Sequence, residues 1–100
     1  MYPLHIALHD GFQRRHVVIV VDGRTVFDRA GVTTDLRISR ADAVDIEVTA
    51  QRITVAVTVD PGGISGSIDL DVAASPYVAI DLQRDGTLRW IRSPEPFHYL

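Results

Sequence analysis

Cysteine, lysine and asparagine are absent from this chain of 100 residues, which has only one methionine and one tryptophan. Without cysteine, the chain cannot form a disulfide framework or a thiolate zinc site. All ten basic side chains besides histidine are arginine, which we interpret as the codon bias of a GC-rich genome. The valine, isoleucine and leucine content is sufficient for one buried core, as expected for a single domain of this length.

Charge and hydrophobicity exclude several classes of partner. The net charge is -3 with both signs interspersed, so the chain lacks the basic stripe of a nucleic-acid-binding protein and the polybasic segment of a membrane-contacting protein. Its longest apolar run, Val17 to Val21, is too short to span a bilayer. The first residues lack the charged and apolar regions of a signal peptide, so we expect a cytoplasmic location.

Three glycine-containing segments give the clearest structural signal. Asp22-Gly23, Asp60-Pro61-Gly62-Gly63 and Asp85-Gly86 separate short runs rich in valine, isoleucine and threonine. Asp before Gly is typical of tight β-hairpins, because both residue types tolerate the positive φ that such turns require. The runs predict strands over residues 3–9, 15–21, 24–28, 35–38, 44–49, 52–59, 64–72, 77–83 and 87–92.

These strands predict an all-β fold over residues 1–100, and no stretch shows the periodicity of a helix. We expect a single antiparallel β-sandwich, immunoglobulin-like or related, with eight or nine strands joined as meander hairpins. The Cys…Trp…Cys signature of immunoglobulin domains is absent, so the likeness is limited to strand number and turn spacing.

Alternation sets the expected register of the middle strands. A two-residue loop at Ala50-Gln51 would join strands 44–49 and 52–59 as a hairpin. Because a one-residue slip would move every apolar side chain to the solvent face, this register is well specified. The apolar rows would be Val48–Ile53–Leu70 and Ile46–Val55–Ile68, with Val44 opposite Val57, and the polar rows would be Thr49–Arg52–Asp71, Glu47–Thr54–Asp69 and Asp45–Ala56–Ser67.

The last hairpin requires a three-residue loop, Arg84-Asp85-Gly86, with Gly86 in a left-handed bulge position. A two-residue loop would mix polar and apolar side chains on each face. The longer loop gives the pairs Leu82–Leu88, Ile80–Trp90 and Asp81–Arg89.

The first two strands predict a sheet that is apolar on both faces. If Leu4, Ile6 and Leu8 pair with Val21, Ile19 and Val17, the second face holds Val18, Val20 and Phe27 beside His5, Ala7, His9 and His16. Strands that are apolar on both sides are usually covered on both sides. We therefore expect the C-terminal tail, a second subunit or another protein to cover this face.

The tail itself, residues 93–100, is extended, proline-rich and apolar. Pro94 and Pro96 end the last strand, and aromatic and apolar residues follow. A disordered terminus is expected to be polar, so this tail packs on its own domain or on a partner. The candidate interface residues are Val18, Val20, Phe27, Phe97, Tyr99 and Leu100.

Three groups of residues are candidates for a chemical site. His9 and His16 are possible cross-strand neighbours, but with Asp10 as the nearest carboxylate they make no complete zinc site. Glu47 and Asp69 would flank Thr54 at a spacing that an inverting glycosidase uses, yet they match an ordinary solvated sheet face. The segment 62–66 lacks the lysine and helix of a phosphate loop. We therefore assign no catalytic, cofactor-binding or metal-binding residue.

The sequence predicts a non-catalytic interaction or assembly domain that self-associates through its first sheet and its tail. The expected partner is a second copy of the chain or another protein. The alternative is a small-ligand or carbohydrate-binding sandwich, for which an exposed aromatic platform is required. The aromatic residues available for such a platform are Tyr2, Tyr77, Trp90, Phe97 and Tyr99, of which Trp90 is expected to point inward.

The face assignment of the middle strands makes a first prediction. Val55→Ala should lower the free energy of unfolding by about 1–3 kcal/mol, because it removes buried methyl groups and leaves a small cavity. Thr54→Ala, on the solvent face next to it, should cost much less. Urea unfolding midpoints that are equal for the two variants would contradict the assignment.

Overall fold

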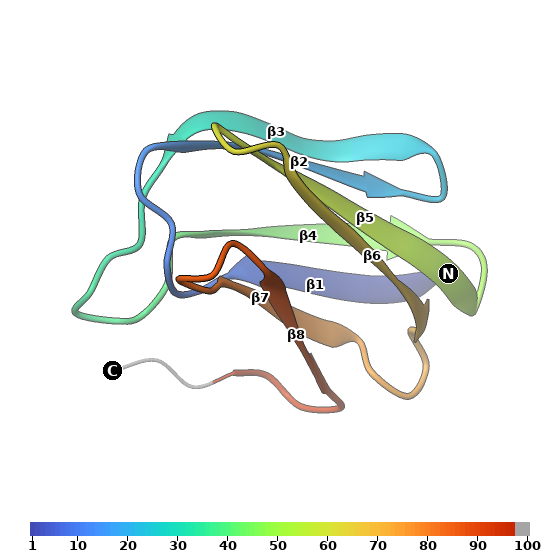
Figure 1. Ribbon diagram of the computed structural model, residues 1–100. Helices are drawn as coiled ribbons and strands as arrows, with labels where there is room; N and C mark the ends of the chain where they lie inside the picture. The colour runs from blue at the N-terminus through green and yellow to red at the C-terminus, as the bar shows by residue number, and fades with distance from the viewer. Residues whose placement is uncertain (98–100) are drawn as a thin grey trace.

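The computed structural model describes residues 1–97, and this part of the chain forms eight β-strands and no helix. The strands lie in two four-stranded sheets, here called sheet A, with the order β4-β1-β7-β8, and sheet B, with the order β3-β2-β5-β6 (Figure 1). They are β1 (Tyr2–Leu8), β2 (Arg15–Val21), β3 (Arg24–Val32), β4 (Asp42–Val48), β5 (Arg52–Asp60), β6 (Ile64–Asp71), β7 (Tyr77–Leu82) and β8 (Leu88–Ser93).

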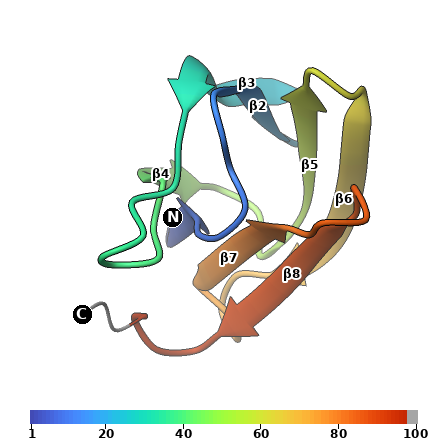
Figure 2. The ribbon, with the colours of Figure 1, turned by 60° about the vertical axis from the view of Figure 1, so that its left-hand side comes forward.

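The core lies between the facing sheets (Figures 1 and 2). Ile6 of β1, Ile19 of β2 and Val55 of β5 each have 0% of their surface exposed. Phe12, in the connection between β1 and β2, adds a fully buried ring at one end. The described residues bury no polar or charged residue, so the interior between the two layers is held by hydrophobic contact. Residues 1–97 contain no helix that could cross a membrane.

The three Asp-Gly segments form the three hairpins, as predicted. They join β2 to β3, β5 to β6, and β7 to β8, each within one sheet. The predicted registers of the last two hairpins are confirmed, with Val55 opposite Ile68 and Ile80 opposite Trp90. The four other connections, which lack this turn chemistry, cross from one sheet to the other.

The predicted hairpin at Ala50-Gln51 is wrong. β4 pairs with β1, so that Leu4 lies opposite Ile46, and the segment 49–51 carries the chain from sheet A to sheet B. Both arrangements turn the same apolar faces of β4 and β5 toward the core, and alternation therefore does not distinguish them. The polar rows that joined Glu47 to Thr54 and Asp45 to Ala56 are consequently absent.

The predicted pairing of β1 with β2 is also wrong. β1 lies in the middle of sheet A, antiparallel to β4 and parallel to β7, with Ile6 opposite both Val44 and Val78. Sheet A is therefore mixed, rather than purely antiparallel as expected. The inner residues of β1 and β2 face each other across the core instead of sharing a row.

No strand forms over residues 35–38. The backbone N–H and guanidinium of Arg37 donate to the carboxylate of Asp35 at 2.9–3.1 Å, which favours a local turn. Ser39 has a positive φ of 53°, and a single bridge between Asp35 and Arg40 closes the loop. The polar side chains of this segment thus satisfy the backbone locally, in competition with a strand.

A bulge corrects the position of Phe27. In a regular two-residue hairpin Val26 would lie opposite Ile19, and Phe27 would share the outer face with Val18. Instead, the register shifts between Ile19 and Val20, and Phe27 lies opposite Ile19. One extra residue in a strand moves the following side chain to the other face. Phe27 therefore points into the core, with 6% of its surface exposed.

Side chains close the two open sides between the sheets. On one side, the Arg29 guanidinium lies 5.4 Å from the centre of the Phe27 ring and donates to Asp42 of β4 at 2.9 Å. On the other side, Leu88 of β8 packs over Gly66 of β6, where an added Cβ would lie 3.2 Å from the Leu88 methyl group. Glycine at this position lets the side chain from the opposite sheet approach the backbone.

The bulge makes the second prediction. Phe27→Ala should lower the free energy of unfolding by about 3–5 kcal/mol, because it removes a buried ring. Thr25→Ala, at an exposed position of the same strand, is the matched control and should change stability by less than about 0.5 kcal/mol. Similar urea midpoints for the two variants would show that Phe27 lies outside the core.

Candidate functional site

The C-terminal tail packs on the outer face of sheet A beside His9 (Figure 1). Ala7 and Ala79 alternate with core residues and so point away from the core, yet each has 0% of its surface exposed. After β8, the chain turns back beneath sheet A (Figures 1 and 2). The Phe97 ring then meets the His9 ring edge-on, with 5.1 Å between the ring centres. Up to Phe97, the tail packs on its own domain.

Burial beneath the tail changes the chemistry of His9. Loss of solvent lowers the pKa of His9 from its ordinary value of 6.5, and the negative charges of Asp81 and Asp10 offset only part of this effect. The positive charge of Arg40 acts in the same direction as burial. The partly buried position of His9 therefore favours its neutral imidazole over the charged form.

The outer face of sheet B has a different character. Val18 lies opposite Thr58, and Val20 lies opposite Ala56, on the two central strands of the sheet. Val18, Val20 and Ala56 are half-buried, and we call them the valine strip. Hydroxyl and carboxylate side chains border the strip on the neighbouring strands, namely Thr25, Asp28, Ser65, Ser67 and Asp69.

The structure separates the six candidate interface residues. Val18 and Val20 lie together on the outer face of sheet B, whereas Phe27 lies in the core beneath them. Phe97 packs on His9 at sheet A. Tyr99 and Leu100 lie outside the described residues. The candidate residues of β2 and those of the tail thus lie on two different surfaces, one on sheet B and one on sheet A.

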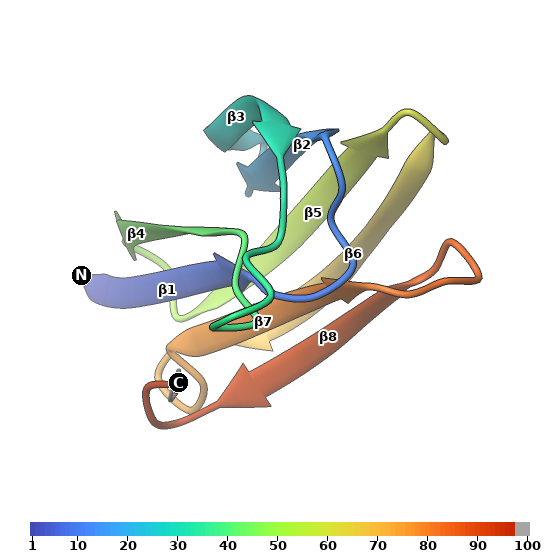
Figure 3. The ribbon, with the colours of Figure 1, turned by 90° about the vertical axis from the view of Figure 1, so that its left-hand side faces the viewer.

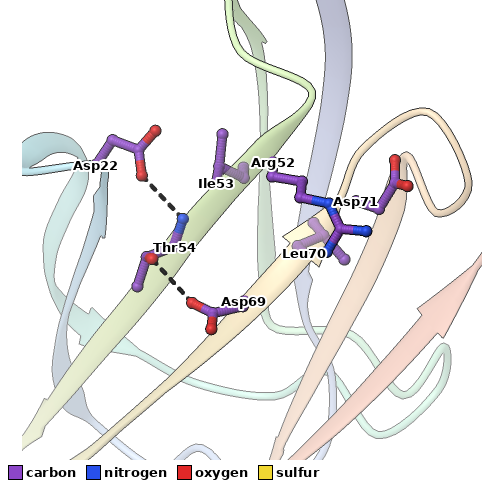
Figure 4. Close-up of a pocket in the computed structure, with 7 residues that line it drawn as sticks. All are labelled: Asp22, Arg52, Ile53, Thr54, Asp69, Leu70 and Asp71. Carbon is purple, nitrogen blue, oxygen red and sulfur yellow. Dashed lines mark hydrogen bonds between the residues drawn. The ribbon is translucent and has the colours of Figure 1, made fainter.

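An acidic pocket of about 280 Å³ lies at one end of sheet B (Figure 4). Asp22 enters it from the β2–β3 turn, and Asp69 from β6. Thr54 connects them, since its backbone N–H donates to Asp22 at 2.8 Å and its hydroxyl donates to Asp69 at 2.9 Å. Both carboxylates therefore fasten the turn and the strand to β5.

Asp71 and Arg52 occupy the same pocket, opposite each other in register as predicted (Figure 4). The pKa of Asp71 lies below its usual range, chiefly because Gln51 donates to its carboxylate. Backbone N–H groups of Ala74 and Ala73 and the charge of Arg52 add smaller contributions. This carboxylate fixes the start of the β6–β7 connection, because it accepts the backbone N–H groups of Ala73 and Ala74.

A smaller pocket of about 140 Å³ lies beside β1, β4 and β7. Nδ1 of His5 and a carboxylate oxygen of Asp45 are 2.7 Å apart, and the Tyr77 ring lies 5.8 Å from the His5 ring. An aspartate orients an imidazole in many active sites, but a nucleophile is required as well. Among the described residues, the other side chains that line this pocket are Pro3, Leu4, Ile46 and Pro76.

The two remaining predicted pairs are not formed. His9 follows β1 of sheet A, whereas His16 lies in β2 of sheet B and bonds Asp28 at 2.5 Å. Glu47 lies opposite Pro3 in sheet A, whereas Asp69 lies in sheet B. Across residues 1–97, no three His, Asp or Glu side chains are placed to hold one metal ion.

Sequence reasoning missed the contacts of His5 and His9. Both arise between segments far apart in the chain, since Asp45 is 40 residues from His5 and Phe97 follows the last strand. The aromatic character of the tail was the one signal available, and it indicated packing without indicating the partner.

No known protein family matches the chain, and no curated protein or solved structure matches it. The candidate surfaces are therefore defined by their own geometry.

The His9–Phe97 contact makes the third prediction. The pKa of His9 is lower in the folded state than in the unfolded state, so the unfolded state takes up a proton first as the pH falls. The stability contributed by neutral His9 is present above about pH 6.5 and is lost as the pH falls through the lower folded-state pKa.

Urea unfolding between about pH 7.5 and pH 5 measures this loss. Compared with the unaltered protein, His9→Gln should show a smaller loss of stability over this range, because glutamine does not titrate. Phe97→Ala should also reduce the loss, because it returns His9 to solvent. Identical pH profiles for all three proteins would refute the role of His9.

Proposed function

We propose that this chain is a non-catalytic interaction domain that self-associates through the valine strip on the outer face of sheet B. One observation is the main support for this proposal. The tail packs on the outer face of sheet A at His9, whereas Thr25, Thr58 and Ser67 on the outer face of sheet B are exposed to solvent.

The composition of this face supports an interface. An antiparallel sheet that faces water on one side normally alternates apolar and polar residues, yet Val18, Val20 and Ala56 break that pattern. An apolar centre with a polar rim is typical of protein–protein interfaces. A two-fold dimer fits this strip, because the same patch then meets itself and the contact closes.

The alternative function, binding of a small ligand or carbohydrate, is supported by the pocket beside His5 and Tyr77. Its volume of about 140 Å³ suits only a small ligand or one sugar substituent. An imidazole, a carboxylate and an aromatic face in one place offer polar contacts and stacking. Trp90 packs against the core, which leaves Tyr77 as the aromatic side chain of this site.

We also propose a type for the fold. Two facing four-stranded sheets support a β-sandwich of the immunoglobulin-like or a related type. The parallel pairing of β1 with β7 departs from two purely antiparallel sheets. We therefore favour a related type over an immunoglobulin domain.

Solution mass tests the proposed assembly. The unaltered protein should be a dimer by light scattering at high micromolar concentration. Val18→Arg should raise the dissociation constant by roughly a hundredfold or more, because it places two unpaired like charges against each other across the axis.

Ala74→Arg is the matched control, because it adds the same charge at an exposed position in the β6–β7 connection. It should leave the dimer intact, and both variants should keep the circular dichroism of the parent. A monomeric parent protein would contradict the proposal.

A further inference from the structure

A second, independent feature is a cavity of about 360 Å³ at the end of the molecule where β1 leads into β2. Its wall combines the β1–β2 connection, the first residues of β2 and β6, and the β7–β8 turn. Figure 3 faces this end and shows these segments gathered there. The valine strip lies on the face of sheet B and contributes no residue to the cavity.

Charge distinguishes this cavity from the rest of the protein. The chain has 13 acidic and 10 basic residues, yet this wall carries Arg15 and Arg84 and no carboxylate. Within residues 1–97, neither guanidinium has a carboxylate oxygen within 4.0 Å. The cavity wall therefore carries two arginines that form no ion pair within the described residues.

The guanidinium of Arg15 is held in place at the wall. Its Nη1 donates to the backbone carbonyl of Pro61 in the β5–β6 turn. Its Nε is buried and has no hydrogen-bond partner in the described part of the chain. Arginine presents planar donors that match an oxyanion, and an arginine that is already fixed loses little conformational freedom on binding one.

Two carboxylates in the turns that border the cavity, those of Asp60 and Asp85, are hydrogen-bonded within their own turns. Asp60 accepts the backbone N–H of Gly63 at 3.2 Å, and Asp85 accepts the backbone N–H and hydroxyl of Thr87 at 3.0 and 2.6 Å. The single hydroxyl proton of Thr87 goes to Asp85, and the side-chain carbonyl oxygen of Gln83 lies 2.9 Å from the same hydroxyl oxygen. The side chain of Gln83 also lines the cavity, where its amide nitrogen is a donor group.

Gly11 fixes the part of the wall where the β1–β2 connection meets the end of β7. Gly11 has a φ of 89°, and a Cβ at this position would lie 1.8 Å from the carbonyl oxygen of Leu82. The backbone N–H of Leu82 in turn donates to the carbonyl of Asp10 at 2.9 Å. The β1–β2 connection is thus locked against the end of β7, and the cavity is formed before any ligand binds.

We propose that this cavity binds a small oxyanion, the phosphate or carboxylate group of a low-molecular-weight ligand. Arg15 and Arg84 supply the charge, and the amide groups of Gln13 and Gln83 supply further donors. The cavity volume of about 360 Å³ leaves room for an organic substituent on that group.

Titration with sodium phosphate and, separately, sodium succinate tests the proposal, with sodium chloride added to keep the ionic strength constant. The backbone amide signals of Gly11 and Gly86, which line the cavity, should shift and saturate in a nitrogen–proton correlation spectrum. The signal of Gly23, in the β2–β3 turn at the other end of β2, should stay in place. The titrant that binds more tightly shows whether the natural ligand presents a phosphate or a carboxylate group.

Arg84→Gln should weaken binding roughly tenfold, because it removes a charge-assisted contact from an exposed turn without disturbing the core. Arg24→Gln removes the same charge at the far end of β2 and should bind like the parent. Arg15→Gln should also weaken binding, and its spectrum reports whether the fold persists. The proposal is overturned if the shifts do not saturate, if chloride alone reproduces them, or if Arg84→Gln and Arg24→Gln behave alike.

Discussion

The central position of β1 is the constraint on which the rest of the structure depends. β1 pairs with β4 on one side and with β7 on the other, and its inner side chains Leu4, Ile6 and Leu8 are almost wholly buried. Because both of its hydrogen-bonding edges are occupied, the hairpin that would otherwise join it to β2 does not form. The connection that follows β1 must then cross to sheet B, which places Phe12 at the end of the core.

The two outer faces of the molecule follow from this arrangement. β8 ends beside the start of β7, so the tail runs back over sheet A and reaches His9 at the end of β1. Ala7 and Ala79 on that face are fully buried, while Thr25 and Ser67 on the outer face of sheet B are exposed. The proposed interface lies on sheet B, away from the tail, whereas the arginine-lined cavity includes Gly11, two residues after His9.

Turn residues and alternation along neighbouring strands predicted the hairpins of the fold. They did not predict which strands far apart in the sequence pair with each other. The Asp-Gly turns and the alternation of β5 with β6 and of β7 with β8 predicted three hairpins, because turn chemistry and register are properties of neighbouring segments. Alternation also predicted which residues of β1 and β4 face inward. It could not predict that they pair with each other, because a crossover and a hairpin present the same faces to the core. Phe27 was misplaced for a related reason, since a bulge leaves no mark in the alternation of a single strand.

The same limits apply to the candidate sites. His5 and Asp45 meet only because β1 pairs with β4, and the cavity beside Arg15 needs the β1–β2 connection and the β7–β8 turn to lie beside the first residues of β2 and β6.

The parallel pairing of β1 with β7 has a consequence for the newly made chain. β1 ends at Leu8, but its parallel neighbour begins only at Tyr77, so the strands from β2 to β6 must be made before that edge is paired. At roughly 5–20 residues per second, this interval lasts several seconds. During synthesis, the backbone N–H and C=O groups along this edge of β1 therefore stay unpaired until β7 has been made.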